Sequence, residues 1–174
     1  MKKILFILLL VSSICNAQQN TVKDVFDVAR YGTVEDIKVL VKQNKDTINA
    51  VNAMGFTPLI LACYRGNTEV AKYLAKNIKD VNYNSSSGTA LAAAAVKGDT
   101  EMAKILLEYK ADPNIADAGG ITPLVYATQF QNKELVALLL SYKADKYRAD
   151  NDGKTPYDHA VFTKNEAIIN LYKK

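Results

Sequence analysis

The octapeptide GFTPLILA at residues 55–62 recurs as GITPLVYA at 120–127 and as GKTPYDHA at 153–160. A degenerate copy reads SGTALAAA at 87–94, and the four Thr residues follow one another at intervals of 32, 33 and 33 residues. A fifth copy, VFDVA at 25–29, lacks the Thr-Pro start. Because self-similarity at a period of about 33 residues is the signature of a repeat architecture, this stretch decides the fold.

Each copy predicts two short helices. Thr before Pro favours a helix start, since the Thr hydroxyl caps the first turn and Pro lacks an N–H that would be unsatisfied there. Thr155 and Asp158 also have the spacing of a capping box. Gly32, Gly66 and Gly98 predict left-handed residues that end the first helix. The residues expected to cap the second helices are Thr33, Asn67, Asp99, Asn132 and Asn165.

One such helix pair cannot bury its own apolar face, whereas stacked pairs share a continuous core. The period, the T-P-L starts, the Gly-Asn/Asp joints and the Ala-Asp-x-Asn loops resemble the ankyrin repeat over about residues 21–174. The resemblance implies an all-α solenoid of about five stacked helix-turn-helix repeats with short hairpin-like loops. We expect this domain at 25–174, with repeats at about 21–54, 55–86, 87–119, 120–152 and 153–174.

Two departures from the family's pattern stand out. The His of the family's T-P-L-H start is replaced by Ile60, Ala92, Val125 and Asp158. Residues with a side chain occupy helix ends where glycine is usual, at Lys110, Gln131, Lys143 and Lys164. At the joints of the last two repeats, Gln131 and Lys164, this second departure predicts modest backbone strain.

The chain opens with a short apolar leader. Lys2 and Lys3 precede an apolar run at 4–11, and small or polar residues follow it. This order is typical of a secretory signal peptide, which we expect at 1–17, with a polar lead-in at 18–24. The export predicted from it places the protein in the periplasm or outside the cell.

The leader allows two kinds of processing. Cleavage after Ala17 is the expectation, and a lipid anchor on Cys15 is the alternative, disfavoured by the large Ile14 before it. A membrane-spanning helix needs about 20 apolar residues, so no permanent span is expected after cleavage.

Composition excludes several classes of protein. The chain has 174 residues, 49% of them apolar, which excludes intrinsic disorder. Its formal charge is +4, and removal of Lys2 and Lys3 lowers this to +2. So small and unclustered a charge does not favour nucleic acid as a partner. Loss of Cys15 leaves Cys63 alone, so no intramolecular disulfide is expected.

No constellation of residues predicts an active site. Cys63 and His159 lie on first helices three repeats apart, hence about 25–30 Å from each other at the usual helix spacing. Three acids recur at one repeat position and would form a row rather than a pair: Asp80, Asp112 and Asp145. We therefore expect neither an enzyme nor a metal or cofactor site.

The resemblance does imply a binding surface. Ankyrin-like arrays bind partners through their loop tips and the exposed ends of their first helices, which together form a concave face. Carried over to this chain, that surface comprises Met54, Phe56, Tyr64, Arg65, Tyr83, Lys97, Ile121, Gln129 and Phe130. For Phe56 and Ile121 the alternative is that they cover the joint between neighbouring repeats.

The resulting hypothesis is an exported module that binds a protein partner on its concave face. The alternatives are an inhibitor or immunity-type protein, or a chaperone-like escort of a secreted or periplasmic enzyme. We expect a monomer, provided that Ile168, Ile169 and Leu171 of the last helix face inward. Exposure of one of these three would favour self-association.

Overall fold

The computed structural model describes residues 24–173, which hold ten α-helices, one 3₁₀-helix and no named strand. The expected signal peptide, its cleavage site and the lead-in up to residue 23 lie outside the described residues. The helices form five pairs: α2 (Val25–Tyr31) with α3 (Val34–Gln43), α4 (Pro58–Arg65) with α5 (Thr68–Asn77), α6 (Ala90–Lys97) with α7 (Thr100–Glu108), α8 (Pro123–Gln129) with α9 (Lys133–Ser141), and α10 (Pro156–Thr163) with α11 (Glu166–Tyr172). The 3₁₀-helix η1 (Lys45–Asn49) follows α3.

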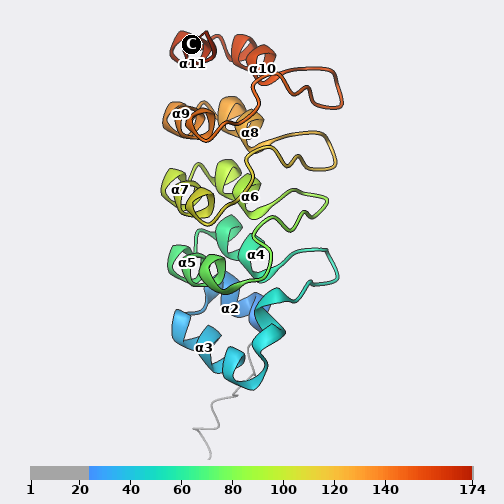
Figure 1. Cartoon of the computed structure of the whole chain (residues 1–174), viewed down its shortest axis with the longest axis vertical. Coiled ribbons are helices and arrows are strands. Elements are labelled where there is room, and N and C mark those ends of the chain that lie inside the picture. The colour runs from blue at the N-terminus through green and yellow to red at the C-terminus, as the bar shows by residue number, and fades with distance from the viewer. Residues whose placement is uncertain (1–23, 174) are drawn as a thin grey trace, which may run out of the picture.

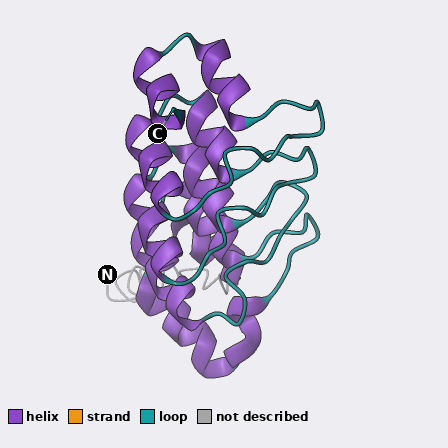
Figure 2. Cartoon of the chain, turned by 45° about the horizontal axis from the view of Figure 1, so that its top comes forward, coloured by secondary structure: helices purple, strands orange, loops and turns teal. Residues whose placement is uncertain are grey.

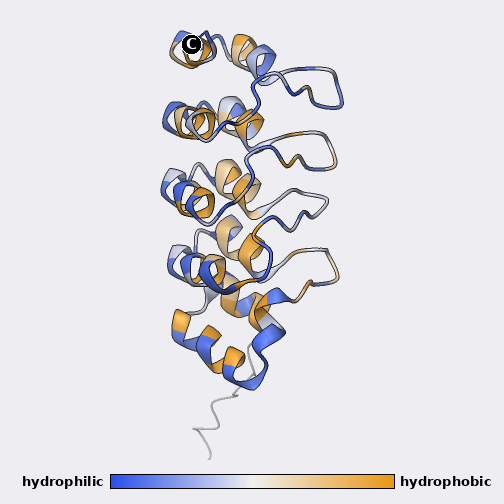
Figure 3. Ribbon diagram, in the orientation of Figure 1, coloured by the Kyte–Doolittle hydropathy of each residue, from blue (hydrophilic) through white to orange (hydrophobic). Residues whose placement is uncertain are grey.

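The pairs stack into an elongated array (Figure 1). The first helices of the pairs form one column and the second helices form a parallel column beside it, and the long loops all project on the side of the first helices (Figures 1 and 2). Apolar residues gather in the first helices and on the inward sides of the second helices (Figure 3). The prediction of an all-α repeat solenoid is confirmed.

Recurring threonine caps start the first helices. The Thr side chains at 57, 89, 122 and 155 each accept a hydrogen bond from the backbone N–H three residues on. The capping box of Thr155 and Asp158 is confirmed, and Thr33 forms a second one with Asp36 at the start of α3. Each helix start therefore supplies its own partners for otherwise unpaired N–H groups.

The helix ends are left-handed as predicted, with one exception. Gly66 and Gly98 have φ angles of 74° and 68°. Gly32 was expected to match them, but its backbone is extended, with φ −90° and ψ −169°. Glycine is needed there for space, because a Cβ would come within 2.7 Å of the Val28 side chain. The four helix ends without glycine are also left-handed: Lys110, Gln131, Lys143 and Lys164.

Four of the five expected caps of the second helices form, and Asn67 is the exception. Its side chain makes no cap on α5, contrary to the prediction. Instead, its amide donates to the backbone carbonyls of Ala29 and Gly32, at 3.2 and 3.0 Å. The residue therefore ties the second repeat to the first.

A ladder of asparagines links neighbouring loops in the same way. Asn82 accepts a hydrogen bond from the N–H of Asp112 at 2.8 Å and donates to the carbonyl of Lys110. Asn114 repeats both bonds one repeat later. Tyr147 stands at the next equivalent position and lies exposed.

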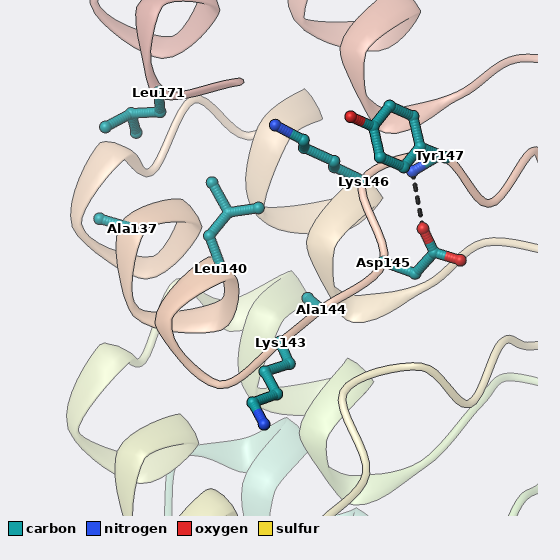
Figure 4. A pocket seen from close by; sticks show the side chains of 8 residues that line it. All are labelled: Ala137, Leu140, Lys143, Ala144, Asp145, Lys146, Tyr147 and Leu171. Atoms are coloured by element: carbon teal, nitrogen blue, oxygen red, sulfur yellow. Dashed lines mark hydrogen bonds between the residues drawn. The ribbon is translucent and has the colours of Figure 1, made fainter. Parts of the chain in front are cut away.

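The last helix packs inward as expected for two of the three residues named. Ile168 and Ile169 are buried, and Leu171 is half-buried. Leu171 lines a cavity of about 620 Å³ with Leu140 of α9 and the loop at 143–147 (Figure 4). Exposure of Leu171 is thus partial, and the expectation of a monomer stays a prediction.

Candidate protein-binding surface

Large side chains recur where the first helices end. Within the two residues before each helix-ending joint, seven side chains are exposed. One is Gln129, and we call the other six the helix-end row: Tyr31, Tyr64, Arg65, Lys97, Phe130 and Phe162. The exposed fraction reaches 70% for Tyr31 and 89% for Phe162. These residues lie one repeat apart along the array, so the row runs along its length.

The backbone explains why these side chains point outward. The preceding turn of each first helix buries the residue that contacts the core, such as Cys63 in α4 and Ala95 in α6. In the last four repeats the left-handed residue that follows then reverses the chain into the second helix, and in the first repeat the extended Gly32 does so. The last residues of the first helix are therefore left at the surface.

The helix-end row is partly organised before any partner binds. The guanidinium carbon of Arg65 lies 5.5 Å from the centroid of the Tyr31 ring, which joins the first two repeats. A cation over an aromatic face is attracted by the ring's quadrupole, worth about 0.5–1 kcal/mol at an exposed site. This contact limits the rotamers of both side chains, so less entropy is lost when a partner immobilises them.

The loop tips present a less uniform surface. Met54 is exposed in the turn of the first long loop. Phe56 and Tyr83 are half-buried and pack against the core. Tyr83 lines a small hollow of about 90 Å³ with Ile48 and Ile78, at the base of neighbouring loops. Of the predicted tip residues, Met54 is thus the one presented freely, whereas Phe56 and Tyr83 contribute to packing.

A cavity of about 840 Å³ lies between the fourth and fifth repeats. Two residues predicted for the binding surface, Ile121 and Gln129, line it together with Phe162 of the helix-end row. Ile121 is half-buried and Gln129 is exposed. The structure thus brings the end of α8, the last long loop and α10 together at one hollow.

A hydrogen-bonded chain forms one wall of this cavity. His159 Nε2 lies 2.7 Å from Asp150 Oδ2, and the Gln129 amide lies 3.3 Å from His159 Nδ1. The amide donates to Nδ1 when the imidazole is neutral, which leaves the Nε2 proton to donate to the carboxylate. Burial opposes ionisation of Asp150, but hydrogen bonds from His159 and from the loop backbone outweigh it and hold the pKa of Asp150 below its ordinary value.

An equivalent hydrogen bond to an Asp carboxylate occurs one repeat earlier, with a Tyr in place of the His. The Tyr126 hydroxyl donates to Asp117 Oδ2 at 2.6 Å, and both pairs span nine residues. Burial and the adjacent carboxylate raise the pKa of Tyr126 to about 12. In both pairs, an Asp three residues before a Gly bonds to a Tyr or His in the following helix. This pairing was not predicted from the sequence, although both residues of each pair can be found there.

Cys63 and His159, the two residues considered as a reactive pair, have separate surroundings in the structure. Cys63 is buried, and burial raises the pKa of its thiol, so it is a poor nucleophile. The bonds of His159 go to Asp150 and Gln129, and neither bond involves Cys63. Within residues 24–173 there is no cluster of three or more potential metal ligands. No helix described in the structure has the length and hydropathy needed to cross a membrane.

Comparison with known proteins agrees with this geometry. The family model described as ankyrin repeats (3 copies) matches residues 25–117 and 110–174. No curated protein gives a significant match. Ankyrin repeats are generally protein–protein interaction modules and typically non-enzymatic binding scaffolds. Since the family model covers most of its length, the chain belongs to the ankyrin repeat family.

Proposed function

We propose that this chain is an exported, non-catalytic module that binds a protein partner along the helix-end row and the adjacent loop tips. The observation that carries this proposal is the recurrence of exposed Tyr, Arg, Lys and Phe side chains within the two residues before the joint of successive repeats. Aromatic residues and Arg are enriched at the energetic centres of protein interfaces. Monomeric proteins seldom present such groups in a continuous series without a binding role.

Export is the part of the proposal that rests on the leader alone. The order of basic residues, apolar run and small residues within 1–17 supports a secretory signal peptide. Expression of the full-length chain in its native host, followed by fractionation and N-terminal sequencing, tests this. An exported protein that begins at Gln18 is the expected result. Retention of Met1 in the cytoplasm would refute export, and a lipid-modified Cys15 would show anchoring instead.

Binding is tested by capture with a tagged full-length chain from the envelope fraction of its native host. The double variant Tyr64→Ala/Arg65→Ala should lose the captured partner, because interface anchors of these types cost more than about 1 kcal/mol each when truncated. Both side chains are exposed, so the variant should stay folded and lose no more than about 0.5–1 kcal/mol of stability from the contact between Arg65 and Tyr31.

The matched control changes two exposed lysines on second helices, Lys104→Ala/Lys133→Ala. It should capture the same partner as the wild type. A partner retained by Tyr64→Ala/Arg65→Ala but lost from the control would place the binding surface on the opposite side of the array. Equal capture by all three proteins would refute a role for Tyr64 and Arg65.

A further inference from the structure

The two cations of the helix-end row, Arg65 and Lys97, are among the described cations that form no ion pair within the chain. Arg30 pairs with Asp27 at 3.1 Å, and Lys72 pairs with Glu69 and Glu101. Within the described residues, by contrast, Arg65 and Lys97 have no carboxylate within ion-pair distance. Two neighbouring repeats thus present cations whose charge is not compensated by the chain itself.

Aromatic side chains flank these two cations on both sides. Tyr31 and Tyr64 lie beside Arg65 in the first two repeats, and Phe130 lies one repeat beyond Lys97. Apolar contacts at both ends exclude water from a central charge pair, which strengthens the pair. The order along the array is therefore aromatic, cation, cation, aromatic.

The sign of the charge changes farther along the array. The cavity between the fourth and fifth repeats is lined by three carboxylates, those of Asp150, Asp152 and Asp158, and by one lysine, Lys154. An acidic partner segment is attracted by the second and third repeats and repelled by the fifth. The charges therefore limit an acidic segment to the stretch between Tyr31 and Phe130.

The spacing of the repeats sets the spacing required of the partner. Packed helices lie about 8–10 Å apart, so Arg65 and Lys97 present their charges at about that interval. In a helix with a rise of 1.5 Å per residue, about seven residues cover this distance. In a strand, side chains three residues apart point to opposite faces, so this distance fits a helical segment instead.

We infer that the partner contributes an acidic and apolar segment to this interface. Two of its carboxylates, spaced i and i+7 in a helix and hence on one face of it, meet Arg65 and Lys97. Its flanking apolar side chains meet Tyr31 and Tyr64 at one end and Phe130 at the other. This inference rests on the proposed function, since it names the chemistry of the partner at the same surface.

The probe for this inference is a phage-displayed library of random 16-residue peptides selected against the tagged full-length chain. Sequences enriched by the wild type should carry Asp or Glu at positions i and i+7, with aromatic or aliphatic residues beside them. The charge-reversal variant Arg65→Glu/Lys97→Glu should weaken binding of the most enriched peptide at least about tenfold, as loss of a complementary interfacial charge pair does. The control Lys104→Glu/Lys133→Glu, with the same change of net charge, should bind as the wild type does.

Each other outcome is decisive. Enriched peptides without acidic residues, whose binding is nonetheless lost in Tyr64→Ala/Arg65→Ala, would overturn the inference and leave the proposed function intact. If the binding of acidic peptides is lost only in Lys104→Glu/Lys133→Glu, both the inference and the proposed function are overturned. A wild type that enriches no sequence would overturn the inference, with the capture experiment still deciding the function. Tighter binding of a fluorescent single-stranded oligothymidine than of every selected peptide would assign the cations to nucleic acid instead.

Discussion

The asparagine ladder provides the sharpest test of how this array is held together. Replacing Asn114 with Ala removes two bonds between neighbouring loops, the 2.7 Å bond from the N–H of Asp145 and the 3.3 Å bond to the carbonyl of Lys143. Each such bond contributes about 0.5–1.5 kcal/mol net. Asp145 and Lys143 are exposed, so water replaces the lost partner and no large penalty for an unpaired buried group is added. We expect Asn114→Ala to lower the free energy of unfolding by about 1–3 kcal/mol.

Tyr147 supplies the matched control, because it occupies the equivalent position one repeat later. Its side chain is exposed and contacts the Lys146 ammonium at 5.5 Å, and its own N–H donates to Asp145 whatever the side chain is. We expect Tyr147→Ala to change the free energy of unfolding by no more than about 0.5 kcal/mol.

Urea unfolding followed by circular dichroism at 222 nm measures both variants. Stability in a repeat array is close to a sum of repeat and neighbour terms, so a weakened interface in Asn114→Ala can also separate the last repeats into an earlier transition. A free energy for Asn114→Ala within about 0.3 kcal/mol of the wild type would refute the ladder as a source of stability. An equal loss in Tyr147→Ala would show that the position, rather than the pair of bonds, is what matters.

Three further predictions concern the core, a helix end and the cavity wall. Leu91 is fully buried in α6, so Leu91→Ala should lower the free energy of unfolding in urea by about 2–5 kcal/mol. Gly98→Ala should lower the free energy of unfolding by about 1 kcal/mol in the same assay. There is space for a Cβ at this position, but its φ of 68° is unfavourable for alanine. Because the folded pKa of Asp150 is lowered, its contribution is complete above its unfolded pKa of about 4 and is lost as pH falls through the folded value. Thermal unfolding between pH 7 and pH 3 should therefore show a smaller loss on acidification for Asp150→Asn than for the wild type.

The fold could be predicted because the same local signals recur in register. A single Thr-Pro pair is weak, but Thr57, Thr122 and Thr155 repeat it at the same phase, and the structure shows each as a helix cap. The left-handed joints at Gln131 and Lys164 could be predicted because position, rather than residue type, dictates the turn there. The fold of such a sequence can be predicted because its independent local conformational preferences all agree with one global arrangement.

The errors arose where one residue type serves two physical purposes. Gly32 occupies a joint, yet its role is to avoid Val28 rather than to adopt a positive φ. Asn67 follows a joint, yet its amide turns toward the preceding repeat instead of capping its own helix. Tyr83 sits in a loop tip by sequence, but its side chain packs on the core. Each choice depends on the neighbouring repeat, which no single copy of the motif specifies.

Comparison of the repeats with one another separates structure from binding. Positions that hold the array together keep one chemical type, as with the capping Thr and the ladder Asn, because each repeat makes the same bonds to its neighbour. By contrast, the joints at Gly66, Gly98 and Gln131 are all left-handed, yet the residue just before them changes from Arg65 to Lys97 and Phe130. Identical geometry removes folding as the reason for this variation, since an exposed side chain there contributes little to stability. The variation is therefore explained by a partner that presents a different side chain to each repeat. A segment with a defined order of charged and apolar side chains is such a partner.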